Sequence, residues 1–237
     1  MNIIIATQNP HKVTEFSACS TQISFEPTPV SIEVDENADS FVGNARLKAR
    51  AYAGALHRNV IADDSGLCVD ALGGAPGIFS ARYATLPPDV DLDPDRQAAN
   101  NRKLLRNLSG VANRAAHFTC ALCLVIVEPC DVAWASSNPE TRHVATFYDD
   151  QFHPVPAGDA RAVCAELVFE AQAHGIILDV LSGTGGFGYD PLFFCPQTGC
   201  TFASLTREQK LGVSHRGRAL AQLAGLFERA CLAEDKG

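Results

Sequence analysis

The chain has 237 residues, of which 46% are hydrophobic and 19% charged, so it is long enough to bury a substantial core. Its formal net charge of −8 argues against nucleic acid as a partner, because neutralising a phosphate backbone needs a basic face. No apolar run approaches the roughly 20 residues needed to cross a bilayer. Nine cysteines without a framework spacing favour reduced thiols. These totals predict a soluble, cytoplasmic globular protein that does not bind a membrane.

The first predicted strand and helix form a candidate anion site. Residues 2–6 indicate a short strand, and a helix is expected from Lys12 to about Ser20. Asn9 is placed to cap this helix, and Pro10 suits its first turn. A helix N-terminus offers free N–H groups and a positive dipole end, to which Lys12 adds a full charge. Without a GxxxxGK[ST] motif, the pattern is also typical of a capped helix that binds nothing.

The stretch 61–77 contains two adjacent carboxylates. An apolar run leads into Asp63 and Asp64, and Ser65 and Gly66 follow, which predicts a buried strand that brings acids to the rim of a sheet. Successive strand side chains point to opposite faces, so both acids reach one site only if the strand ends there. Otherwise one acid faces the site and the other supports it. Oxygen ligands without nearby Cys or His suit Mg²⁺, although an Asp-Ser-Gly turn closing a strand is the alternative.

The middle of the chain predicts further elements. A helix over 41–57 would place Asn44 and Lys48 one turn apart, unless these two simply form a solvated helix face. Residues 128–165 are proline-bearing and weakly periodic, which indicates a surface insertion between two strands. The runs 166–171 and 175–181 predict a hairpin that returns to the sheet.

A glycine-rich stretch follows. Gly183, Gly185 and Gly188 satisfy GxGxxG, but a strand with proline comes next instead of a helix, so the dinucleotide-binding interpretation fails. These glycines would let the backbone approach a ligand closely. The Phe187 ring would stack on the ligand, and Asp190 would recognise its polar groups.

The last predicted helix, over 219–233, is a second candidate anion site. Ser214 can cap its N-terminus, and His215 and Arg216 stand at its positive end. A helix start with a basic pair is also common as plain structure.

Seven motifs taken in chain order resemble the inosine triphosphate pyrophosphatase family over nearly the whole chain except about residues 128–165. They are Thr7-Gln8-Asn9-Pro10-His11-Lys12, Asn44-Ala45-Arg46-Leu47-Lys48-Ala49, Ala62-Asp63-Asp64-Ser65-Gly66-Leu67, Gly73-Gly74-Ala75-Pro76-Gly77, Ser80-Ala81-Arg82-Tyr83, Gly186-Phe187-Gly188-Tyr189-Asp190-Pro191 and Ser214-His215-Arg216. Each motif is weak alone, and the ordered set is specific.

The resemblance implies an α/β fold that is elongated and two-lobed, with helices flanking a mixed twisted sheet and a nucleotide groove between the lobes. It implies a single nucleoside triphosphate pyrophosphatase domain over residues 1–237 and a homodimer. The implied reaction is Mg²⁺-assisted water attack on the α-phosphate of ITP, dITP or XTP, giving the monophosphate and pyrophosphate. Such an enzyme removes deaminated purines from the nucleotide pool.

The resemblance also implies roles for individual residues. Asp64 would be the Mg²⁺ ligand and proton acceptor, with Asp63 as a further metal ligand. The residues implied to bind substrate are Thr7, Gln8, Asn9, His11, Lys12, Lys48, Ser65, Phe187, Gly188, Tyr189, Asp190, Lys210, His215 and Arg216.

One departure from the family pattern concerns the metal. The family usually has a metal-ligand glutamate where this chain has Gly43, and Glu36 or Asp39 could substitute for it, unless Asp63 and Asp64 hold the metal with more water. A catalytically impaired nucleotide-binding protein is therefore the alternative function. A related hydrolase for a modified pyrimidine or an ordinary nucleotide is a third hypothesis.

Overall fold

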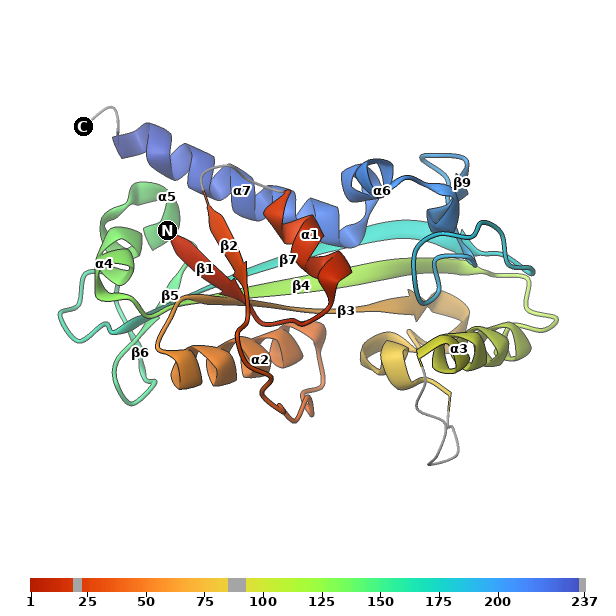
Figure 1. Ribbon diagram of the computed structural model, residues 1–237, viewed down its shortest axis with the longest axis horizontal. Helices are drawn as coiled ribbons and strands as arrows, with labels where there is room; N and C mark the ends of the chain where they lie inside the picture. Colours follow the sequence, from red (N-terminus) through yellow and green to blue (C-terminus); the bar gives the residue numbers. More distant parts are fainter. Residues whose placement is uncertain (19–22, 85–92, 235–237) are drawn as a thin grey trace. The chain divides into compact units, whose positions relative to one another are not determined.

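The computed structural model describes residues 1–18, 23–84 and 93–234, without the side chains of residues 10, 11, 93–95, 233 and 234 (Figure 1). The chain forms two compact units. Unit 1 comprises Met1–Asp64, Ala121–Glu170 and Ala219–Gly237, and unit 2 comprises Ser65–Cys120 and Ala171–Arg218.

The strands form one mixed sheet in the order β2-β1-β3-β4-β7-β5-β6, with β8 paired to β7 and β9 to β8. Strand β1 is parallel to β2 and β3, whereas β5 is antiparallel to β7. The strands are β1 (Asn2–Ile5), β2 (Ser24–Pro27), β3 (Val60–Val69), β4 (Ala115–Ile126), β5 (Thr146–Tyr148), β6 (Pro154–Val155), β7 (Cys164–Ile177), β8 (Phe193–Cys195) and β9 (Cys200–Thr201).

Helices flank this sheet, so the predicted α/β class with a mixed sheet is confirmed. They are α1 (Pro10–Ser17), α2 (Phe41–Leu56), α3 (Asp93–Asn107), α4 (Pro129–Ser137), α5 (Pro139–Arg142), α6 (Arg207–Val213) and α7 (His215–Glu234), with 3-10 turns η1 (Asp70–Leu72), η2 (Gly77–Arg82) and η3 (Phe202–Ser204). Within the described ranges, none of the helices is both long and apolar enough to cross a membrane.

In unit 1, helix α2 covers one face of the sheet while α1 and α7 lie on the other (Figure 1). The Ser40 side chain caps the start of α2 by accepting a hydrogen bond from Gly43 N–H, and the helix ends at His57 in the left-handed conformation. Ala45 and Ala49, four residues apart, are fully buried against the sheet. This anchoring fixes the position of the rest of the helix.

Strand β3 corrects the prediction that Asp63 and Asp64 stand at the rim of the sheet. The strand continues for ten residues through both acids and through Ser65 to Val69, so the two carboxylates lie in its middle. Leu67 and Val69 are fully buried, and their burial extends the strand past the polar residues. The two acids therefore point to opposite faces of the sheet.

Strand β7 corrects the predicted hairpin over 166–181. It is continuous from Cys164 to Ile177, without a turn between the two apolar runs. Gly175, which suggests a turn in the sequence, has another reason to be glycine: a Cβ there would overlap the carbonyl oxygen of Phe194 on the paired strand β8.

The segment 128–165 contains α4, α5, β5 and β6 between strands β4 and β7. Its apolar residues Val132, Ala135 and Phe147 are buried, and β5 pairs with β7. The segment is thus an integral part of unit 1.

Unit 2 has an aromatic core. The rings of Phe118, Phe193 and Phe202 contact one another with centroid separations of 4.7 to 5.9 Å. This cluster packs beneath the glycine-rich loop, since Tyr189 and Leu192 belong to the same buried group.

A buried carboxylate, Glu166 of β7, ties helix α2 to the sheet. Its side chain is 1% exposed and accepts hydrogen bonds from Arg46 Nε at 3.0 Å and from Arg50 Nη2 at 2.5 Å. The Cys123 thiol also donates to it, at 3.2 Å. Burial alone would raise the pKa of Glu166, but the hydrogen bonds from Arg50 and Cys123 and the charges of both arginines outweigh it and lower the pKa.

We expect Glu166→Gln to lower the free energy of unfolding by about 1–3 kcal/mol at pH 7, because it removes the charge that both arginines share. The pKa of Glu166 is lower in the folded than in the unfolded protein, so its ionised form stabilises the fold. This stabilisation is fully present above the unfolded pKa of about 4.3 and is lost as the pH falls through the folded pKa. Urea unfolding from pH 7 to pH 3 should therefore show the gap between wild type and variant closing in acid. Glu170→Gln, at an exposed position of the same strand, is the control; an equal loss in both variants, or a gap independent of pH, would contradict the account.

Candidate functional site

Three of the predicted substrate-binding residues of unit 1 line one cavity. Thr7, Gln8 and Lys48 line a space of about 300 Å³ next to β1, together with Glu36 and Tyr52. The space lies where β1 ends, as the sequence predicts for a strand that leads into a helix N-terminus. Glu36, one of two candidates to replace the missing family glutamate, is thus at this cavity.

The Asn9 N–H donates to Thr7 Oγ1 at 3.2 Å, which shapes the turn before α1. The chain continues directly into α1 at Pro10, and Val13 N–H donates to the Asn9 carbonyl. The side chain of His11 is outside the described residues, so its predicted role stays a prediction.

The two central acids are held by different helices. Asp63, 2% exposed, pairs with Lys12 of α1 at 2.9 Å, and its backbone carbonyl accepts from Lys48 Nζ at 3.2 Å. Asp64 Oδ2 accepts from Asn44 Nδ2 of α2 at 3.1 Å. The structure therefore brings together the predicted Lys12, Lys48 and Asp63, and gives Asp64 a partner.

The surroundings of Asp64 raise the pKa of its carboxyl. Burial raises the pKa of the Asp64 carboxyl above its ordinary value, and Glu36 and Asp63 add to the rise, although Asn44 and Lys48 oppose it. Lys48 has a raised pKa despite its burial, because Asp63 and Glu36, the latter at 2.6 Å, stabilise its charge. Such a carboxylate is a better proton acceptor than an exposed one.

Oxygen atoms make up the anionic groups of this cluster, as a hard cation requires. The charges of Glu36 and Asp63 both raise the pKa of Asp64, so a divalent cation bound beside Asp64 would relieve this repulsion. The donor set therefore fits Mg²⁺.

The glutamate that is usual in the family does not fit at position 43 without a rearrangement. A Cβ at this position would lie 2.6 Å from Ala38 Cβ and 3.0 Å from Ser40 Oγ. The turn before α2 is packed for a glycine, so the segment carrying Glu36 would have to move to admit glutamate at position 43.

In unit 2, Asp190 is the centre of a second buried cluster. Its Oδ2 accepts from Lys210 Nζ at 2.5 Å and from Phe187 N–H at 2.8 Å. The Lys210 ammonium lies 4.6 Å from the centroid of the Phe187 ring, which is half-buried and accessible to a ligand. Gly186 completes the loop, since it has φ +72° and a Cβ there would overlap the Asp190 carboxylate.

The basic pair at the start of α7 belongs to the same unit. Arg216, 2% exposed, donates from Nη2 to Ser65 Oγ at 3.1 Å and lies 6.0 Å from the Phe187 centroid. His215 stacks on Phe118 with a centroid separation of 4.8 Å. Ser214 caps the helix as predicted, by accepting from Gly217 N–H.

Tyr189 differs from its neighbours in the loop. Its ring is buried, its hydroxyl donates to the Ser80 carbonyl at 2.9 Å, and burial raises its pKa. This side chain supports the loop from the core side.

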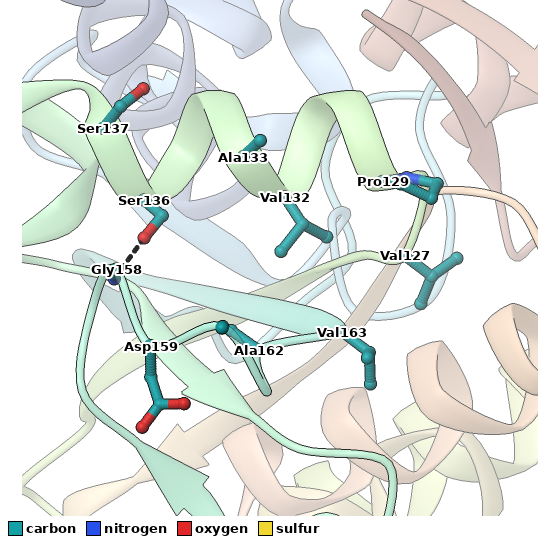
Figure 2. Close-up of a pocket in the computed structure, with 11 residues that line it drawn as sticks. Val127, Pro129, Val132, Ala133, Ser136, Ser137, Gly158, Asp159, Ala162 and Val163 are labelled. Atoms are coloured by element: carbon teal, nitrogen blue, oxygen red, sulfur yellow. Dashed lines mark hydrogen bonds between the residues drawn. The ribbon is translucent and has the colours of Figure 1, made fainter.

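Two other features of unit 1 lie away from these residues. An open cavity of about 460 Å³ is lined mainly by α4 and the segment 158–163, where the Gly158 N–H donates to Ser136 Oγ. Figure 2 shows its mainly apolar lining, which includes none of the predicted site residues. Within the described part of the chain, Glu128, Cys130 and Asp131 form a group of metal-ligand type. Its carboxylates already bind Arg58 and Asn59, which gives them a structural role.

Sequence reasoning missed two residues of α3, Gln97 and Asn101, which hydrogen-bond to the backbone of Gly188. They are about 90 residues from the loop that they contact, and no local motif points to them. It also missed Ser31 and Tyr52 in the wall of the unit 1 cavity.

The comparisons with known proteins agree with one another. Residues 3–226 match the model of the Ham1 family. A dITP/XTP pyrophosphatase of Ralstonia nicotianae is 38% identical over 235 residues, covering 96% of this chain and 98% of the relative. A dITP/XTP pyrophosphatase of Listeria monocytogenes is 39% identical over 228 residues, covering 93% of this chain and 92% of the relative.

Solved structures show the same relationship. The Staphylococcus aureus Ham1 protein aligns with a TM-score of 0.70 and 32% identity, covering 96% of this chain and 98% of that one. A nucleoside-triphosphatase and dITP/XTP pyrophosphatase of Mycobacterium abscessus aligns with a TM-score of 0.62 and 34% identity, covering 94% and 98%. The predicted relationship is confirmed, and the chain belongs to the Ham1 family.

Proposed function

We propose that this chain hydrolyses non-canonical purine nucleoside triphosphates, with ITP, dITP and XTP as substrates, to the monophosphate and pyrophosphate. Relatives named dITP/XTP pyrophosphatases, 38% and 39% identical over nearly their whole length, support the proposal. The observation that carries it is the unit 1 cavity, in which Thr7, Gln8 and Lys48 lie together with the carboxylate of Glu36.

The triphosphate is assigned to the residues at the end of β1 and the start of α1. Lys12 and Lys48 provide positive charge, and Thr7, Gln8 and Asn9 provide polar groups beside free backbone N–H groups of the helix. We include His11 from the family resemblance. The pairing of Lys12 with Asp63 keeps the ammonium group in place before a nucleotide binds.

Asp64 is assigned as the general base. A water molecule attacks the α-phosphorus, its oxygen forms the new P–O bond, and its proton passes to the Asp64 carboxylate. The bond between the α-phosphorus and the bridging oxygen breaks, and that oxygen leaves with pyrophosphate. Asn44 orients the acceptor through its hydrogen bond to Asp64 Oδ2.

Mg²⁺ is proposed as the cofactor, held by Asp64 with Glu36, while Asp63 on the other face of β3 supports the site through its pair with Lys12. When bound, it would polarise the phosphoryl oxygens and neutralise charge that develops in the transition state. We favour Glu36 over Asp39 as the replacement for the missing family glutamate, because Glu36 lines the cavity and acts electrostatically on Asp64. With this carboxylate present, Gly43 does not favour an impaired binding protein.

The purine and ribose are assigned to unit 2. Phe187 offers a ring face, and the Asp190–Lys210 pair and Arg216 offer polar groups beside it. Ser65, Gly188, Tyr189 and His215 complete the set. A donor that meets the 6-oxo group of inosine or xanthine would be left unpaired by the 6-amino group of adenine, which disfavours ATP by about 1–3 kcal/mol per donor.

A homodimer and a cytoplasmic location remain part of the proposal. The family resemblance supports the dimer, and nine cysteines without disulfide spacing support a reducing compartment.

The proposal predicts pyrophosphate release from ITP, dITP and XTP that depends on Mg²⁺ and far exceeds release from GTP and ATP. Asp64→Asn should lower kcat by about 10²- to 10⁴-fold, as expected for loss of a general base.

Asp63→Asn is the matched control, since it neutralises the adjacent acid, and it should raise KM more than it lowers kcat. Folded wild-type protein that binds ITP and releases no pyrophosphate would overturn the proposed activity. Near wild-type turnover by Asp64→Asn would overturn the role of that residue.

A second prediction concerns the metal. We expect Glu36→Gln to weaken Mn²⁺ binding, measured by electron paramagnetic resonance without nucleotide, by about ten-fold, as is typical when a ligating or supporting carboxylate is lost. Asp39→Asn, which removes the other candidate carboxylate at an exposed position, should leave Mn²⁺ affinity unchanged. Equal affinities in wild type and Glu36→Gln would show that Glu36 does not replace the family glutamate.

A further inference from the structure

Helix α3 holds both backbone polar groups of Gly188. Gln97 Oε1 accepts a hydrogen bond from Gly188 N–H at 2.9 Å, and Asn101 Nδ2 donates to the Gly188 carbonyl oxygen at 3.0 Å. The two side chains are four residues apart and so share one face of the helix. Gly188 has φ +61°, a left-handed conformation that is thereby fixed from outside the loop.

Gly188 is inside the turn that carries the ligand-facing groups of the loop. Asp190 N–H donates to the Phe187 carbonyl, and Phe187 N–H donates to the Asp190 carboxylate, so these two residues close the turn around Gly188. A change in the orientation of Gly188 therefore moves both the Phe187 ring and the Asp190–Lys210 pair.

The two hydrogen bonds to Gly188 run in opposite directions, because the Gln97 side chain accepts and the Asn101 side chain donates. Asn101 is 8% exposed, and its Oδ1 is buried without a hydrogen-bond partner in the described part of the chain. Rotating the amide would place this oxygen against the Gly188 carbonyl oxygen, so the carbonyl determines the orientation. Position 101 requires a donor, whereas position 97 requires only an acceptor.

The adjacent residue Asn100 serves the scaffold instead. Its amide contacts the Ser80 and Ala81 carbonyls and the Ala84 N–H, which fixes the turn η2 to α3. Helix α3 is thus anchored independently of Gly188, and Gln97 and Asn101 are not needed to hold it in place.

We propose that Gln97 and Asn101 are positioning residues for the purine, which act by fixing Gly188 and, through it, Phe187 and Asp190. This inference rests on the proposed function, because it takes Phe187 and Asp190 as groups that contact the nucleotide.

The difference in polarity gives a test with isosteric variants. Asn101→Asp places an acceptor against the Gly188 carbonyl and should raise KM for ITP about ten-fold, with kcat changed less than about two-fold. Gln97→Glu keeps an acceptor for the Gly188 N–H and should raise KM no more than about three-fold, while Gln97→Ala should raise it about as much as Asn101→Asp. Asn107→Asp adds the same negative charge to α3 away from Gly188 and is the control for charge.

Thermal unfolding of each variant shows whether the fold is retained. Calorimetric binding of ITP without divalent metal should give the same ranking of affinities, so the test does not depend on turnover. Equal KM increases in Asn101→Asp and Gln97→Glu, or no increase in Asn101→Asp, would overturn the positioning role. If the wild type releases no pyrophosphate but the variants keep the predicted ranking of ITP affinities, the proposed function is overturned and the positioning role is not.

Discussion

The buried Asp63 and the half-buried Asp64 in the middle of strand β3 are the constraint on which the candidate site depends. A carboxylate that is 2% exposed, as Asp63 is, would be strongly destabilising without a partner, so Lys12 of α1 has to reach it. Asp64, on the other face, is satisfied by Asn44 of α2. The strand thus determines which side chains each helix must present. The same burial raises the pKa of Asp64 and makes it suitable for accepting a proton.

Unit 2 also contains a buried carboxylate, which is paired with a buried lysine. Asp190 is 2% exposed and Lys210 is 8% exposed, and each is satisfied chiefly by the other. The loop around Asp190 requires glycine at position 186, because any side chain there would displace the carboxylate. Rigidity of this loop is consistent with a role in discriminating bases, since discrimination by hydrogen bonds requires donors that cannot rearrange to suit the wrong base.

Local chemistry made part of the structure predictable. The helix over residues 41–57 and the cap at Ser214 follow from periodicity and a capping residue, and the structure contains them. The continuous course of β3 and β7 was not predictable, because the pairing of neighbouring strands overrides local turn signals at Ser65-Gly66 and Gly175. The motifs identified the charged residues of the site, whereas the contacts from α3 to Gly188 connect distant segments and leave no periodic signal.

The central claim is that water attacks the α-phosphorus, and isotope labelling tests it most directly. Hydrolysis of ITP by the wild-type protein in ¹⁸O-labelled water, with the products analysed by mass spectrometry, shows which phosphorus receives the oxygen. The account predicts that the label appears in the monophosphate and not in pyrophosphate. Label in pyrophosphate, or release of labelled orthophosphate, would contradict the account, because the attack would then occur at the β- or γ-phosphorus.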